Sequence, residues 1–216
     1  MLSLSFSAGM LGIEGYVVRV EADSSPGSPA CTIIGLPDRA LSESRERVRA
    51  AIFNSGFAYP AGRLLVNLSP ADVRKEGPGF DLAIALALLA IDEQVDRLHL
   101  QEFIALGELA LDGTLRPVHG ILPMVIGARN AGFTKLIVPE HNTDEAALVG
   151  GIELYAVDSL SSAISVLLGD GGKWRTRTST PSFEAHDAVV HGDLADVRGQ
   201  VGVTQGRHYR HDRGKD

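Results

Sequence analysis

Residues 35–49 read GLPDRALSESRERVR, and this stretch predicts a passage from a strand into an amphipathic helix. Asp38 follows a proline and can accept hydrogen bonds from the first free backbone amides of a helix. Apolar and small side chains then recur at helical spacing up to residue 55, with arginine and glutamate on the opposite side. Gly56 favours the left-handed conformation that ends helices. We therefore expect a helix over residues 39–55.

The remainder of the first 169 residues alternates between short strands and helices, which predicts an α/β (α+β) domain. Residues 80–91 are apolar on all sides, so this helix should lie in the centre of the core. Asp112-Gly113 predicts a tight hairpin turn between residues 103–111 and 114–118. The other expected strands cover 4–10, 15–21, 30–34, 63–68, 135–138 and 153–156, and the other helices cover 120–131, 143–149 and 160–168.

The domain organisation follows from a change in composition after Gly169. From there the content of glycine, serine, threonine and proline rises and the apolar periodicity ends. We expect a folded domain over residues 1–169, a flexible linker over 170–192 and a disordered segment over 193–216.

Composition limits the class of protein. A net charge of −7 argues against a general nucleic-acid coating protein, which usually carries a basic field. Cys31 is the only cysteine, so there is no disulfide framework and no thiolate zinc cluster, and its apolar neighbours predict a buried strand thiol. The N-terminus lacks signal-peptide features, and the longest apolar run, residues 82–91, is about half of a membrane span. We expect a cytoplasmic protein without a membrane contact.

Two further stretches complete a recognisable pattern. Residues 67–82 read NLSPADVRKEGPGFDL, and residues 107–120 read GELALDGTLRPVHG. Together with residues 35–49 they resemble the N-terminal domain of the Mg-chelatase-like AAA+ ATPases of the ComM/YifB type. They also resemble, more distantly, the Lon protease domain. The resemblance implies a Lon-protease-like, ribosomal protein S5-like fold over about residues 1–169.

Residues 193–200 read DLADVRGQ, a segment that in this family stands just before the AAA+ module. The 16 residues that follow are polar, rich in glycine, arginine and histidine, and without apolar spacing. We interpret residues 193–216 as a remnant of the segment before an AAA+ module, left by truncation or a split reading frame. A natural short form with a disordered tail is the alternative.

The Lon resemblance also implies positions for a catalytic serine and lysine. Gly79 stands at the serine position and Leu122 at the lysine position. Glycine has no side chain to acylate and leucine cannot accept a proton, so we expect no catalytic residues in this chain. Ser69 and Lys75 lie nearby in sequence, but Ser69 precedes a proline at a strand end, where it more simply turns the chain.

ATP chemistry requires a phosphate-binding loop of the form Gly-x4-Gly-Lys-Ser/Thr. The glycine-rich residues 76–81, 169–174 and 199–206 all lack it, so we expect no cofactor in this chain, although complete family members use ATP and Mg. His208 and His211 are expected in an exposed tail, and we predict no metal site. The alternative is a hydrolase: an ATPase completed by a split partner polypeptide, or a divergent Lon-like peptidase.

Four arginines form a candidate DNA or subunit interface: Arg45, Arg47, Arg49 and Arg74. Rows of arginine can contact phosphates. Glutamates are interleaved, however, and Glu43 can pair with Arg47 at i,i+4. No aromatic residues alternate with these charges to stack bases. The pattern favours a helix surface or subunit interface over DNA, and any DNA contact should be weak and sensitive to salt.

The family resemblance implies a function for a complete member: a hexameric ATP-driven motor acting on branched DNA in recombination and natural transformation. In such a machine this domain would be a non-catalytic accessory domain that organises subunits or engages a partner or DNA. The partner would be a second copy of the chain or a separate AAA+ polypeptide.

Overall fold

The computed structural model describes residues 1–35, 38–71, 73, 75 and 78–176, apart from the side chains of residues 38–42. The chain divides into two units, Met1–Pro181 and Ser182–Asp216, and every described element belongs to the first. Residues 170–176 of the expected linker are described. The rest of the linker and the DLADVRGQ segment lie outside the described residues.

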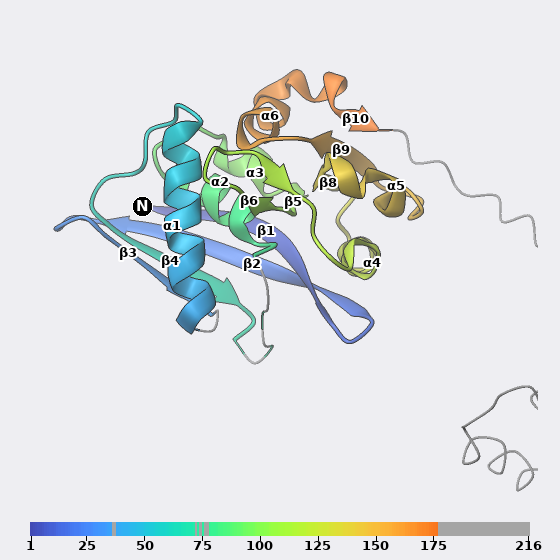
Figure 1. Ribbon diagram of the computed structural model, residues 1–216, viewed down its shortest axis with the longest axis horizontal. Coiled ribbons are helices and arrows are strands. Elements are labelled where there is room, and N and C mark those ends of the chain that lie inside the picture. Colours follow the sequence, from blue (N-terminus) through green and yellow to red (C-terminus); the bar gives the residue numbers. More distant parts are fainter. Residues whose placement is uncertain (36–37, 72, 74, 76–77, 177–216) are drawn as a thin grey trace, which may run out of the picture. The chain divides into compact units, whose positions relative to one another are not determined.

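A mixed sheet forms the framework of the first unit (Figure 1). In the described part of the chain its strand order is β10-β9-β8-β5-β1-β2-β4-β3. The pairs β1–β2, β2–β4 and β9–β10 are antiparallel, whereas β3–β4, β1–β5, β5–β8 and β8–β9 are parallel. The strands are β1 (Leu2–Leu11), β2 (Glu14–Ser25), β3 (Ala30–Ile34), β4 (Arg63–Ser69), β5 (Phe103–Ala105), β8 (Lys135–Pro139), β9 (Glu153–Val157) and β10 (Arg175–Thr176).

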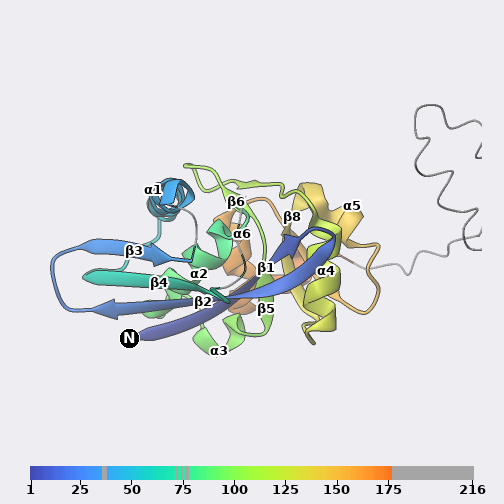
Figure 2. The same cartoon turned by 90° about the horizontal axis from the view of Figure 1, so that it is seen from below.

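Helices pack on both faces of this sheet, and the buried apolar residues accordingly form two clusters. One cluster joins the sheet to α1 (Asp38–Asn54), α2 (Asp81–Ile91) and α6 (Leu160–Ser165). The other joins it to α4 (Ile121–Asn130) and α5 (Thr143–Ala146). Figure 2 shows α1 above β3 and β4. The short elements are α3 (Arg97–Leu100), η1 (Glu140–Asn142), η2 (Val166–Asp170), η3 (Gly171–Lys173) and the small hairpin of β6 (Glu108–Leu109) and β7 (Leu115–Arg116).

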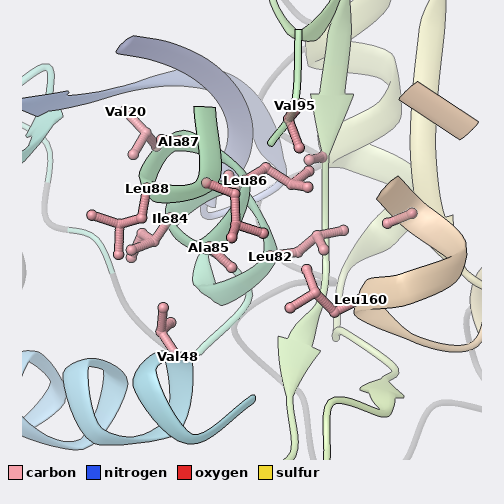
Figure 3. Close-up of a cluster of buried hydrophobic side chains, with 14 of the residues drawn as sticks. Val20, Val48, Leu82, Ile84, Ala85, Leu86, Ala87, Leu88, Val95 and Leu160 are labelled. Carbon is pink, nitrogen blue, oxygen red and sulfur yellow. The ribbon is translucent and has the colours of Figure 1, made fainter. Parts of the chain in front are cut away.

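Helix α2 lies in the centre of the core, as its uniform apolar sequence predicts. All of its residues are buried. Figure 3 shows Leu82 and Leu86 of this helix, with Val48 of α1, Val20 of β2 and Leu160 of α6 in the same cluster. Burial of this kind contributes roughly 1.5–3 kcal/mol for each large aliphatic side chain.

A serine row on β1 fixes the distance between α2 and the sheet. Ser3, Ser5 and Ser7 alternate along β1 and are all buried. Ser3 Oγ donates to the carbonyl of Ala87 at 2.5 Å, and Ser5 Oγ donates to that of Ala83 at 2.8 Å. The two carbonyls lie one helical turn apart, so small hydroxyl side chains at every second position let the helix approach the strand closely.

The structure corrects four sequence-based expectations. Residues 103–111 do not form one hairpin arm, because β5 joins the large sheet and the chain turns at Gly107, where φ is 151°, before β6 begins. The helix expected over 143–149 ends at Ala146. The folded part continues past Gly169, because β10 pairs with β9. Cys31 is partly rather than fully buried.

Candidate functional site

The first residue of α2 carries a buried carboxylate that ties three elements together. Asp81 Oδ1 accepts a hydrogen bond from Ser44 Oγ of α1 at 2.7 Å. Arg47, one helical turn further along α1, donates from Nε to Asp81 Oδ2 at 2.8 Å and from Nη2 to Oδ1 at 3.2 Å. The backbone amide of Leu109 in β6 donates to Oδ2 at 3.4 Å. Asp81 therefore joins α1 and the small hairpin to the start of α2.

Burial and pairing act in opposite directions on this ion pair. Burial raises the pKa of Asp81, and its hydrogen bonds with Arg47 and Ser44 oppose that rise. Burial alone would lower the pKa of Arg47, but the bond and charge of Asp81 outweigh it, so the pKa of Arg47 is raised. The arginine that the sequence placed in a candidate interface thus points to the interior and is a structural partner of Asp81.

A pocket of about 640 Å³ lies beside Gly79, the position that the Lon resemblance assigns to the catalytic serine. Gly79, just before α2, lines it together with Phe80, Val118 and His119. The rest of the lining comes from the β1–β2 hairpin and from α4. These residues are Met10, Leu11, Gly12, Tyr16 and Met124. The lining is mainly apolar, so the pocket favours an apolar side chain over a charged group.

The two positions that the resemblance assigns to catalysis bring no reactive group into this pocket. A Cβ at Gly79 would lie 3.3 Å from Cγ1 of Val118. Glycine at this position therefore keeps the space beside Val118 open. Leu122 lies in the first turn of α4 and packs against the second apolar cluster. Its backbone amide donates to Glu145 Oε1 at 3.3 Å.

The other two residues considered for catalysis lie at the end of β4 and in the loop that follows it. Ser69 is the last residue of β4. The side chain of Lys75 is buried, and its ammonium donates to the carbonyls of Pro70 and Val73. An ammonium held by two carbonyls stabilises the loop between β4 and α2. Among the described residues, no group of three or more histidine, cysteine, aspartate or glutamate side chains could hold a metal ion. His208 and His211 lie outside the described residues.

The remaining candidate arginines lie on the outer side of α1. Arg45 Nε lies 3.2 Å from Oε1 of the adjacent Glu46. Arg49 lies over the ring of Tyr59, with 5.7 Å between Cζ and the ring centroid. Arg74 lies outside the described residues. The structure therefore brings Arg45 and Arg49 together and separates both from Arg47.

Arg45 and Arg49 border a groove between α1 and the edge strand β3. Its two adjoining pockets measure about 470 and 570 Å³ and share Pro29, Glu46, Arg49, Tyr59 and Pro60. Burial raises the pKa of Tyr59, and the hydrogen bond between its hydroxyl and Cys31 raises it further, so this phenol is neutral at ordinary pH. Sequence reasoning missed Tyr59 because it lies in the irregular segment between α1 and β4, which has no periodicity. The aromatic residue next to Pro60 was the one signal that the sequence offered.

The sequence can now be placed among known proteins. Residues 20–142 match the family described as subunit ChlI of Mg-chelatase. The chain belongs to this ChlI family. Over 202 residues it is 42% identical to an uncharacterized protein of Mycobacterium tuberculosis strain H37Rv. It is 40% identical over 203 residues to competence protein ComM of Haemophilus influenzae, and 40% identical over 199 residues to YifB of Escherichia coli K12.

These alignments cover 92% of the ChlI-family chain but only 38–39% of each relative. The chain thus spans about two fifths of the length of the curated relatives that it matches, and it corresponds to their ChlI-type N-terminal region. Lon protease of Salinispora arenicola is 29% identical over 140 residues, which is 61% of this chain and 18% of that protease. This similarity agrees with the Lon-like elements of the sequence. None of the helices that the structure describes has the length and apolar character needed to cross a bilayer.

Proposed function

We propose that this ChlI-family domain is a non-catalytic accessory domain that docks a partner protein or a neighbouring subunit in a Mg-chelatase-like AAA+ assembly. One observation supports this most directly: the pocket beside α2 is well formed, yet Gly79 and Leu122 bring no nucleophile or base to it. A pocket in which the positions of the Lon-type serine and lysine hold glycine and leucine fits binding better than peptide cleavage by that route.

ATP hydrolysis belongs, in this proposal, to another part of the complete protein. None of the chain's glycine-rich segments has the lysine and hydroxyl that cradle a triphosphate and its magnesium. A fluorescent ATP analogue titrated with Mg into the purified chain is expected to give no saturable signal. Binding in the micromolar range would contradict the proposal and require a nucleotide site of another kind.

DNA engagement is the less favoured role because of where the arginines lie. Arg47 is already engaged by Asp81, and Glu46 lies beside Arg45 and Arg49. These two arginines are too few for strong binding to phosphates, so binding to forked DNA should be weak and should fall steeply with salt.

The test of the proposed function is a peptidase assay on the purified chain with labelled casein and a fluorogenic peptide. We expect no turnover above buffer. Turnover that disappears in Ser69→Ala would overturn the assignment. A second measurement uses the Haemophilus influenzae relative: deletion of the matching N-terminal segment should leave the ATP hydrolysis that the family resemblance implies. Complete loss of ATP hydrolysis in a folded deletion variant would show that the domain takes part directly in hydrolysis.

A further inference from the structure

The groove along α1 has two chemically different ends. At one end Phe53 is 75% exposed, beside Ala50, Pro60 and Ala61. An exposed phenylalanine in an apolar recess is a typical anchor point for a partner, since aromatic residues concentrate binding energy in interfaces. This end of the groove therefore fits an apolar side chain.

The other end of the groove is cationic. It carries two guanidinium groups, those of Arg45 and Arg49, against the single carboxylate of Glu46. Both guanidinium groups act electrostatically on the Tyr59 hydroxyl, so they lie close to the same point of the groove. Arg49 is exposed and rests on the Tyr59 ring, which orients it without neutralising it. A ligand carboxylate would complement this end.

The floor of the cationic end is the edge strand β3, whose residues 30–32 line it. Within the described residues β3 pairs with β4 alone. The amide of Ala30 donates to the carbonyl of Gly62 and so faces β4. Because peptide groups alternate in direction along a strand, those of Cys31 and Ile33 face away from the sheet. The strand reads ACTII and contains no proline or charged residue of the kind that blocks pairing at natural sheet edges.

We propose that the groove between α1 and β3 binds an extended acidic peptide segment of a partner protein, which pairs with β3 as an added strand. A carboxylate of the segment meets Arg45 and Arg49, and an apolar side chain occupies the recess beside Phe53. Such strand addition takes its affinity from backbone hydrogen bonds and its specificity from the flanking side-chain pockets. The inference rests on the proposed docking function and names the class of partner and its site.

The test starts from a displayed library of random twelve-residue peptides selected on the complete 216-residue chain. Enriched sequences should contain aspartate or glutamate together with an aromatic or aliphatic anchor. A fluorescein-labelled peptide from this set is then titrated by anisotropy. Arg49→Glu should weaken its binding about tenfold or more, and Phe53→Ala severalfold. Arg129→Glu, the same charge change at an exposed arginine of α4, should leave binding within about twofold.

A second probe tests strand pairing without changing the protein. The same peptide, N-methylated at alternate residues, keeps its side chains but loses backbone donors, and it should bind at least about tenfold more weakly. Enrichment of basic peptides or of no shared pattern overturns the proposal, as do equal effects of Arg49→Glu and Arg129→Glu or undiminished binding of the methylated peptide. Concentration-dependent dimerisation abolished by Arg49→Glu would instead assign the groove to a second copy. All these outcomes are independent of the casein assay, which judges the proposed function itself.

Discussion

Arg47 and Asp81 form a bidentate ion pair between two helices, with 2.8 Å between Nε and Oδ2 and 3.2 Å between Nη2 and Oδ1. The side chain of Asp81 is 1% exposed and that of Arg47 is 21% exposed. The carboxylate is shielded from solvent. Its hydrogen-bond donors are Arg47, Ser44 and the backbone amide of Leu109. A charge buried in this way depends on its partners much more than a surface charge does.

Removal of the arginine should therefore be costly. Arg47→Met keeps most of the apolar stem but leaves Asp81 buried without a counter-charge, and we expect a loss of about 3–5 kcal/mol in the free energy of unfolding. Urea denaturation measures this loss. Arg45→Met is the matched control on the same helix, because its pair with Glu46 is exposed and such pairs contribute about 0–1 kcal/mol. Equal losses in the two variants would show that the buried pair has no special role.

The decrease in the free energy of unfolding at acidic pH should depend on Asp158. Its carboxylate accepts hydrogen bonds from Ser162 Oγ at 2.8 Å and Ser159 Oγ at 2.9 Å, and these bonds lower its pKa below the ordinary value of an aspartate. A carboxyl whose pKa is lower in the folded state stabilises the fold above its unfolded pKa and loses that contribution as the pH falls through the folded value.

Between pH 5 and strongly acidic pH, the free energy of unfolding of the native chain should thus fall more than that of Asp158→Asn. Asp144→Asn, at an exposed carboxylate of α5, provides the comparison. Denaturation curves across this pH range measure the difference. Parallel pH profiles for the native chain and Asp158→Asn would contradict the predicted linkage.

Leu86 tests the central position of α2. Its side chain is fully buried, so Leu86→Ala should lower the free energy of unfolding by about 2–5 kcal/mol through lost burial and a residual cavity. Leu98→Ala, at a leucine that is 78% exposed, should change it by less than about 0.5 kcal/mol. A cost below about 1 kcal/mol at Leu86 would be incompatible with the packing in Figure 3.

Gly127 lies in the middle of α4, where alanine normally stabilises a helix by about 1 kcal/mol. Here the opposite is expected, because a Cβ at Gly127 would lie 2.3 Å from the carbonyl oxygen of Gly15 in β2. Gly127→Ala should cost about 1–3 kcal/mol by overpacking, measured by thermal or urea unfolding. Gly172→Ala, where a Cβ meets nothing within 4 Å, is the control. A stabilised Gly127→Ala variant would show that α4 can move away from β2.

The sequence predicted the elements whose signal is local. The uniform apolar character of residues 81–91 placed α2 in the core, and the ends of β3 and β8 agree closely with the expected ranges. The serine row of β1 was missed, because its alternation suggests a half-solvated strand. Instead the hydroxyls of Ser3 and Ser5 are buried against carbonyls of α2, and that of Ser7 against the Ala105 carbonyl of β5. The two-part path of residues 103–116 was also missed, since β5 is defined by partners far away in sequence.

The candidate site shows the same limit. Arg45, Arg47 and Arg49 follow one another closely in sequence, and helical spacing alone could not tell which of them turns inward. That choice is made by Asp81, 34 residues after Arg47. The groove likewise depends on Tyr59 and Phe53, which flank opposite sides of a turn and show no shared pattern until α1 packs over β3.

The position of β1 has a consequence for synthesis on the ribosome. Phe6 of β1 pairs with Ile104 of β5. This pairing cannot form until β5 has been translated, about 100 residues after β1. At roughly 5–20 residues per second this interval lasts about 5–20 s, during which one border of the nascent β1–β2 hairpin has no partner. Unpaired strand borders recruit other chains. The nascent polypeptide is therefore most prone to aggregation before Ile104 emerges, and chaperones that bind extended segments have their longest opportunity in that interval.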